Sequence, residues 1–256
     1  MAVVGAGVAG LAAAAELAGR GPVIVLDRLP VPGGVLPYDA PEVRRLADRC
    51  AAAGVRWLLG TTALRWQDGR LLAAGPDGIS WVSAAHLVFA GGDRPATAAE
   101  LPLTGPRLAG VLPAPVAIHL AEAKVVLGRH VVIVGTGDWA GAARHAIARQ
   151  RAEVTVIARE AAPGPAFPHD RLIRGWVPVA VSGSGRVSTL TLEKSTQQYA
   201  ITCDAVILAE AVRPLRNVDG AIVDPAPGVT FVQPAAGVTT AGAAAEHARR
   251  AVADLT

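Results

Sequence analysis

Apolar residues along this chain fall into short runs whose spacing alternates between that of buried strands and that of helices. Residues 1–4 form the first run, and a glycine-rich turn and an alanine-rich stretch at residues 9–18 follow it. Residues 23–26 form a second apolar run. This order predicts a strand, a turn, a helix and a second buried strand, which is the start of a parallel βαβ sheet.

Shorter elements are predicted after this unit. Residues 41–53 begin at a proline, end before Gly54 and predict a helix. Short apolar runs follow, and Asp-Gly and Pro-Asp-Gly turns separate the last three of them, which predicts hairpin-connected strands. A buried strand at residues 87–90 closes the segment. The strands predicted before it cover residues 55–59, 63–66, 70–74 and 79–82.

The same pattern returns at residue 130, after a proline-rich linker at residues 93–127 that contains one candidate helix, residues 116–126. The predicted elements of this second copy cover residues 130–134, 138–150, 154–157, 177–181, 187–192 and 205–209, with another strand around Ala200. This internal repeat predicts two open parallel sheets, each with a glycine-rich turn after its first strand. A closing strand at residues 229–232 and a closing helix at residues 243–255 contain no third copy.

The first turn has the pattern G-x-G-x-x-G at Gly5, Gly7 and Gly10. In this pattern the first glycine permits a tight turn, the second lets the backbone approach a pyrophosphate, and the third lets helix and strand pack closely. The N–H groups and the dipole at the start of the helix favour bound phosphates. Asp27 ends the next strand, where an acid binds a ribose hydroxyl. The pattern predicts a dinucleotide site; the alternative is a plain strand–turn–helix with a surface aspartate.

The second turn has the related pattern G-x-G-x-x-A at Gly135, Gly137 and Ala140. No acid ends the strand that follows, and Arg159 stands near that position. An arginine there can accept a 2′-phosphate, which favours NADP over NAD. The alternative is that Arg159 is a solvated charge at a strand end and that the second site is silent.

Composition excludes several other classes of protein. Apolar residues make up 52% of the chain, and the formal net charge of +3 comes without clustered basic residues, which predicts no nucleic-acid partner. Cys50 and Cys203 are far apart in the sequence and form no C-x-x-C, so neither a disulfide scaffold nor a redox dithiol is expected. A cytoplasmic location is expected instead. Residues 1–26 are apolar enough for a signal or membrane segment, but Glu16 and Arg20 interrupt them. A buried βαβ start explains them better than a membrane span.

The chain as a whole resembles the flavoproteins with two dinucleotide-binding domains, the pyridine nucleotide–disulfide oxidoreductase-like superfamily. This resemblance implies that the first glycine motif binds FAD, that the second binds NAD(P), and that the second domain is inserted in the first. The expected fold class is therefore α/β, with two Rossmann-like three-layer nucleotide-binding domains, each with a β-meander. The FAD-binding domain is expected at residues 1–100 plus 212–256, and the NAD(P)-binding-like domain with its linker at residues 101–211.

The resemblance also implies cofactor-binding residues in the first domain. Asp27 takes the adenosine ribose, with Arg28 beside it. The residues expected to hold the FAD pyrophosphate are Gly5, Gly7, Ala9 and Gly10. Gly34 and Val35 are expected along the diphosphate or ribityl chain. Ala90 and Gly91 correspond to the family's A-T-G strand end, here without the threonine, and Gly242 corresponds to the glycine of the C-terminal Gly-Asp near the flavin.

Within the superfamily, residues 103–114, 131–139 and 217–222 resemble the α subunits of multi-subunit dehydrogenases and oxidases. These are the α chains of hydrogen cyanide synthase, opine dehydrogenase, D-hydroxyproline or L-proline dehydrogenase and sarcosine oxidase. There, a partner β flavoprotein oxidises an amine or amino acid, and the α chain, often with a small [2Fe–2S] protein, passes electrons on. The resemblance therefore implies an FAD-dependent oxidoreductase subunit that relays electrons within a hetero-oligomer.

Two departures from the family pattern leave alternatives open. Ala243 stands where the family has an aspartate that bonds the flavin ribityl or phosphate, and the redox C-x-x-C is absent, which predicts no disulfide-reductase activity. Because flavin and nicotinamide themselves carry hydride chemistry, no catalytic side chain is expected, and the scattered histidines predict no metal site. The alternatives are a nucleotide-binding structural subunit with one or both sites silent, and a stand-alone NAD(P)H-dependent flavin reductase.

Overall fold

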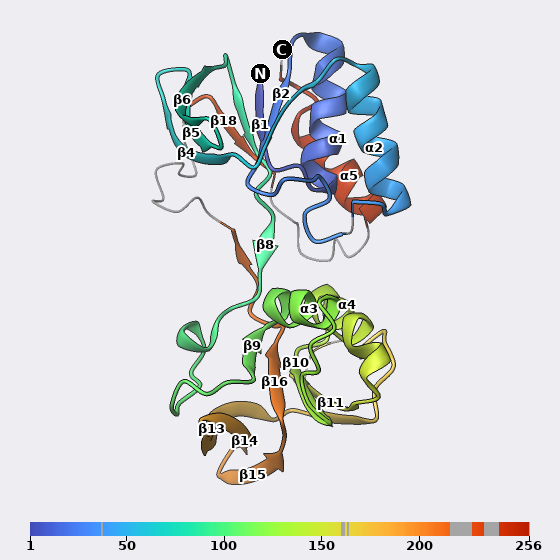
Figure 1. The fold of residues 1–256 in the computed structure, drawn as a ribbon, viewed down its shortest axis with the longest axis vertical. Coiled ribbons are helices and arrows are strands. Elements are labelled where there is room, and N and C mark those ends of the chain that lie inside the picture. The colour runs from blue at the N-terminus through green and yellow to red at the C-terminus, as the bar shows by residue number, and fades with distance from the viewer. Residues whose placement is uncertain (37, 160–161, 163, 216–226, 233–240, 256) are drawn as a thin grey trace. The chain divides into compact units, whose positions relative to one another are not determined.

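The computed structural model describes the chain except residues 37, 160–161, 163, 216–226, 233–240 and 256. It divides into two compact units (Figure 1). Unit 1 comprises Met1–Asp93 and Pro214–Thr256, and unit 2 comprises Arg94–Arg213. The short strands β8 (Asp93–Arg94) and β17 (Arg213–Pro214) pair with each other where the chain leaves unit 1 and returns to it.

Unit 1 is built on a five-stranded parallel sheet in the order β18-β7-β1-β2-β3. The bounds of its strands are β1 Ala2–Val4, β2 Ile24–Asp27, β3 Arg56–Leu59, β7 Leu87–Phe89 and β18 Val229–Phe231. Helices pack on one face, as Figure 1 shows, and an antiparallel meander packs on the other. The helices are α1 Val8–Leu17, α2 Pro41–Ala52 and α5 Ala241–Ala251, with a 3₁₀ turn at Ala18–Arg20. The meander strands are β4 Thr62–Gln67, β5 Arg70–Gly75 and β6 Gly78–Ser83.

Alternation along the central strands explains these layers. Val3 and Val25 belong to the core shared with the helices, whereas Ala2, Ile24 and Leu26 belong to the core shared with the meander. Successive side chains of a strand point to opposite faces, and a parallel sheet covered on both faces needs apolar residues at every position. The uninterrupted apolar runs in the sequence therefore correspond to strands buried on both sides.

Unit 2 repeats this plan with a parallel sheet in the order β12-β11-β10-β16-β9. The bounds of its strands are β9 Val111–Pro113, β10 His130–Val134, β11 Glu153–Ala158, β12 Arg171–Arg174 and β16 Ala205–Leu208. One face carries the helices α3 Ala114–Glu122 and α4 Asp138–Ile147, and the other carries the meander. The meander strands are β13 Val177–Ser184, β14 Arg186–Lys194 and β15 Gln197–Thr202; 3₁₀ turns lie at Ala98–Glu100 and Ala148–Gln150.

The predicted α/β class with two Rossmann-like parallel sheets is confirmed, and the main differences lie in the linker and at the sheet edges. The expected helix at residues 116–126 begins two residues earlier, with Pro115 in its first turn, and it ends before Lys124, whose φ of +63° is not helical. Strands β9 and β12 were not predicted. The family-like segment 217–222 lies outside the described residues. Among the helices that the structure describes, none is long and apolar enough to cross a membrane.

Candidate functional site

The first glycine turn connects β1 to α1, and two of its three glycines are required by the fold itself. Gly5 has a φ of +105°, and a Cβ at this position would overlap the carbonyl oxygen of Ala90. A Cβ at Gly10 would overlap the carbonyl oxygen of Gly5, so the first turn of α1 lies directly on the end of β1. Both positions therefore exclude a side chain, with or without a ligand.

Gly7 differs from these two glycines. It caps α1 in an extended conformation, with φ −72° and ψ 177°, which any residue can adopt. A Cβ there would meet its nearest atoms, in Gly33 and Gly34, at 3.9 Å, an ordinary contact. Within the described part of the chain, nothing in the packing requires glycine at this position. Its lack of a side chain leaves the backbone N–H groups of α1 open to a ligand.

The amino end of α1 suits an anion. Among the described residues, no side chain caps this end, and its first turn contains no acidic residue. Such a helix end has backbone N–H groups without an intrahelical partner and carries partial positive charge. Ala9 lies in the first turn of this helix. The end of α1 is therefore arranged as phosphate-binding helix ends are.

The loop at Gly33 and Gly34 lies against this turn. Gly33 donates a backbone hydrogen bond of 2.9 Å to the carbonyl oxygen of Ala6. Gly34 has a φ of +67°, and a Cβ on it would lie 3.2 Å from the Cα of Gly7. The structure thus brings Gly34 beside the glycine turn, whereas the side chain of Val35 is exposed.

Asp27, at the end of β2, contacts the turn directly. Its carboxylate accepts hydrogen bonds from the backbone N–H groups of Ala6, at 2.6 Å, and Leu29, at 2.8 Å. The sequence predicted a ribose ligand for this side chain, and the structure adds that the same carboxylate holds the glycine turn in place. Arg28, the next residue, is exposed.

The remaining predicted residues of unit 1 lie at different distances from the turn. Ala90 follows β7 and donates a backbone hydrogen bond of 2.7 Å to Val4, which places the end of β7 beside the turn, and Gly91 comes next. Gly242 is exposed in α5, a helix that packs against α1 through Ala245 and Ala248. Ala90 is therefore part of the site's backbone, while Gly242 lies at the start of a neighbouring helix.

The second glycine turn connects β10 to α4 in unit 2. Gly135 has a φ of +117°, and a Cβ on it would lie 3.0 Å from the carbonyl of Ala209 and 3.1 Å from the Cβ of Glu210. Gly137 caps α4 in an extended conformation, and a Cβ on it would meet nothing within 4 Å. Asp138 lies in the first turn of α4. Its negative charge at a helix amino end makes this second turn less favourable to phosphate than the first.

Arg159 is paired in this structure. Its guanidinium donates to the carboxylate of Glu210 through Nε, at 3.2 Å, and Nη2, at 3.3 Å. Arg159 follows β11 and Glu210 follows β16, and β10 lies between these two strands. The ion pair therefore spans the carboxyl end of β10, where the glycine turn begins. The sequence analysis missed Glu210, although the acid directly after the apolar run at residues 205–209 was a visible signal.

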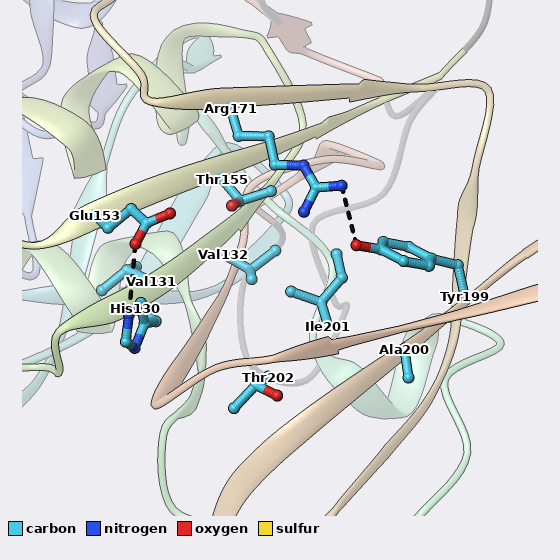
Figure 2. A pocket seen from close by; sticks show the side chains of 10 residues that line it. All are labelled: His130, Val131, Val132, Glu153, Thr155, Arg171, Tyr199, Ala200, Ile201 and Thr202. Atoms are coloured by element: carbon cyan, nitrogen blue, oxygen red, sulfur yellow. Dashed lines mark hydrogen bonds and ion pairs between the residues drawn. The ribbon is translucent and has the colours of Figure 1, made fainter.

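A pocket of about 250 Å³ also lies in unit 2 (Figure 2). Figure 2 shows Glu153 and His130 on one side, and Arg171 and Tyr199 on the other. Oε2 of Glu153 lies 3.4 Å from Nε2 of His130, and Nη2 of Arg171 donates a hydrogen bond of 2.9 Å to the Tyr199 hydroxyl. His130, Glu153 and Arg171 begin β10, β11 and β12, so the pocket lies at the amino ends of these strands. In open α/β sheets the dinucleotide lies outside the carboxyl ends, so this pocket is separate from the second glycine turn.

Both cysteines are buried, and they belong to different units. Burial raises the pKa of each thiol to about 11, and the Sγ of Cys50 donates to the carbonyl oxygen of Leu11 at 3.3 Å. A thiol with such a pKa is almost entirely protonated at neutral pH and reacts slowly, because the thiolate is the reactive form.

Two parallel sheets, each with a glycine turn at the carboxyl end of its central strand, define a protein with two dinucleotide-binding domains. Residues 1–174 match the pyridine nucleotide-disulphide oxidoreductase family. The chain belongs to this family of flavin-dependent oxidoreductases, whose members bind FAD and use NAD(P)H. No curated protein matches the chain in sequence.

Solved structures show the same fold at low sequence identity. Thioredoxin reductase from T. acidophilum superposes with a TM-score of 0.71 at 18% identity, over 99% of this chain and 96% of that one. A pyridine nucleotide-disulfide family oxidoreductase from Enterococcus faecalis V583 superposes with a TM-score of 0.68 at 17% identity, over 99% of this chain and 68% of that one. L-proline dehydrogenase from P. horikoshii superposes with a TM-score of 0.62 at 18% identity, over 90% of this chain and 49% of that one. This chain thus spans about half the length of that dehydrogenase chain.

Proposed function

We propose that this chain is an FAD-dependent oxidoreductase subunit that relays electrons within a hetero-oligomeric amine or amino-acid dehydrogenase or oxidase. In this proposal its partners are a substrate-oxidising flavoprotein subunit and a small [2Fe–2S] protein. The observation that carries the FAD site is Gly7, a glycine that the surrounding packing does not require. A bound pyrophosphate explains it, because only glycine lets the backbone at the start of α1 approach the phosphates.

The residues of unit 1 fit this cofactor. Bound FAD supplies the hydride and electron transfer. The N–H groups at the start of α1 would hold the pyrophosphate, with Gly7 and Gly34 carrying no side chain beside them. Asp27 orients the turn through Ala6, and its remaining carboxylate lone pairs would be available to accept hydrogen bonds from the ribose hydroxyls. No side chain of the chain is assigned a covalent role.

The chain is proposed to lack disulfide-reductase activity. That chemistry needs a pair of cysteines close enough to exchange a disulfide, and one of them must be reactive as a thiolate. The chain has two cysteines, and each is buried with its pKa raised to about 11. Electrons are therefore proposed to leave the flavin for a partner protein or a nicotinamide.

The experiment is a cofactor titration followed by reduction. The purified chain is mixed with FAD, desalted and examined by absorption spectroscopy, and NADPH, NADH or the reduced partner flavoprotein is then added without oxygen. A yellow protein whose flavin band bleaches with the reduced partner supports the relay. A colourless protein that takes up no FAD contradicts the proposal. Rapid oxidation of NAD(P)H by the isolated chain with an artificial acceptor identifies a stand-alone flavin reductase instead.

A second candidate function is a nucleotide-binding structural subunit with one or both sites silent. Two observations favour it: Ala243 replaces the family's aspartate after Gly242, and the Arg159–Glu210 ion pair spans the second glycine turn. Under this hypothesis the complex with its partner keeps full activity when Gly7 is replaced by a bulky residue. A loss of electron transfer in that variant excludes a silent first site.

A further inference from the structure

The two units of the repeat differ at one position beside the glycine turn. In unit 1, Ala90 follows β7 and donates its backbone N–H to Val4, and Gly91 comes next. In unit 2, Ala209 follows β16 and donates its backbone N–H to Val134 in the equivalent way, at 2.9 Å. Glu210 therefore occupies in unit 2 the position that Gly91 occupies in unit 1. The second site has an acidic side chain where the first has none.

Glu210 is directed at the residue expected to hold a nucleotide 2′-phosphate. Adjacent strands are about 4.8 Å apart, so the two strands flanking β10 are about 10 Å apart. Only two long side chains meeting halfway can bridge this distance, and Arg159 and Glu210 do so with two hydrogen bonds. The carboxylate is the more buried partner, with 14% of the Glu210 side chain exposed against 62% for Arg159.

We infer that Glu210 is a specificity-determining residue of the second site, because it competes with the 2′-phosphate of a nucleotide for Arg159. The cation that would select NADP(H) over NAD(H) is already paired within the protein. A 2′-phosphate must displace the Glu210 carboxylate and then lie near its negative charge. Glu210 thus weakens the binding of NADP(H) and reduces discrimination between the two nicotinamide nucleotides.

This inference rests on the second site of the proposed function, and it corrects the simple expectation from Arg159. A free arginine at the end of β11 predicts a preference for NADP. An arginine whose charge is neutralised by a partly buried carboxylate predicts a weak preference.

The test is calorimetric titration of the full chain with two fragments that differ only in the phosphate, 2′,5′-ADP and 5′-AMP. The variants are Glu210→Gln, Arg159→Gln and the double variant. Glu153→Gln is the matched control, because it removes a carboxylate at the opposite end of the same sheet, where Glu153 lies 3.4 Å from the His130 ring. The measured quantity is the ratio of the two affinities, which a general loss of structure does not shift selectively. Thermal unfolding of each variant checks its folding.

The expected result is that Glu210→Gln raises the ratio in favour of 2′,5′-ADP by at least about fivefold, the equivalent of one partly exposed ion pair. Glu153→Gln leaves the ratio unchanged. In the Arg159→Gln background, the Glu210 substitution no longer raises it, because the competition has been removed. A double-mutant cycle measures this dependence directly.

Three outcomes overturn the inference: an unchanged ratio in Glu210→Gln, an equal increase when Arg159 is absent, or no binding of either fragment to wild type and Glu210→Gln. Its failure is distinguishable from failure of the proposed function. If FAD binds to unit 1 while the ratio stays constant, the inference alone is wrong. If the ratio responds as expected while the chain takes up no FAD, the proposed electron relay is wrong, but the role inferred for Glu210 in the second site is correct.

Discussion

The backbone N–H of Ala6 donates a hydrogen bond of 2.6 Å to the carboxylate of Asp27. This bond joins the middle of the glycine turn to the end of β2, two segments that the helix α1 separates in the sequence. The other carboxylate oxygen accepts the N–H of Leu29 at 2.8 Å. One side chain thus fixes the shape of the turn and the path of the chain after β2.

Replacing Asp27 by asparagine is expected to weaken both the fold and the FAD site. The asparagine amide has one accepting oxygen, so one of the two backbone N–H groups loses its partner. Losing a hydrogen bond to a charged group costs about 1.5–3 kcal/mol. We expect a lower free energy of unfolding in urea and at least about tenfold weaker FAD binding, equivalent to about 1.4 kcal/mol. Unchanged values for both quantities contradict the role given to this carboxylate.

Replacing Gly10 by alanine is expected to destabilise unit 1. The added methyl group overlaps the carbonyl oxygen of Gly5, so α1 must move away from β1. Forcing an extra methyl group into such a close contact costs about 1–3 kcal/mol. Differential scanning calorimetry measures the effect. Gly19→Ala is the control, because a Cβ there meets nothing within 4 Å; equal unfolding temperatures for the two variants contradict the predicted overlap.

The two cysteines are expected to resist thiol reagents while the chain is folded. At pH 8, a thiol with a pKa of about 11 is thiolate in about one molecule per thousand, and both sulfur atoms are buried as well. Labelling with iodoacetamide and mass spectrometry are expected to show slow modification of the native chain and rapid modification in denaturant. Rapid labelling of Cys50 or Cys203 in the native chain contradicts their burial.

Asp204 is expected to make the stability of unit 2 depend on pH. Its carboxylate accepts backbone N–H groups of Arg129, at 2.8 Å, and His130, at 2.9 Å, and these bonds lower its pKa below the ordinary value of 3.8. A lowered pKa stabilises the fold above the unfolded-state pKa, and this contribution is lost as the pH falls through the folded-state pKa.

The comparison is between wild type and Asp204→Asn, unfolded in urea at a series of pH values. The difference in the free energy of unfolding is expected to be largest at neutral pH and to shrink below about pH 4, as the wild-type carboxylate becomes protonated. A difference that stays constant down to pH 2 shows that the carboxylate charge does not contribute.

Much of the fold was predictable because a covered parallel sheet has a strong sequence signal. Strand β10 has the predicted bounds, and the glycine turns lie where the motifs placed them. Strands β9 and β12 escaped prediction because they are short strands at the sheet edges, and β12 has only Leu172 and Ile173 between two arginines. For such strands the pairing partner, rather than the local pattern, determines the structure.

The partners of site residues were less predictable than the site residues themselves. Asp27 and Arg159 were identifiable by their distance from the glycines, but the bonds to Ala6 and Glu210 depend on which strands are neighbours. Glu210 reaches Arg159 only because β16 and β11 flank β10. The pocket in Figure 2 was missed for the same reason, since it combines residues from the unpredicted β12 and the distant β15.

The most direct test of the account is the affinity for FAD of Gly7→Ala beside the control Gly19→Ala. The packing around Gly7 accommodates a methyl group, so both variants are expected to unfold at the wild-type temperature. We predict that Gly19→Ala binds FAD as wild type does, whereas Gly7→Ala binds at least about tenfold more weakly. If Gly7→Ala binds FAD as tightly as wild type, the pyrophosphate does not lie at this turn, and the proposed flavin site is wrong.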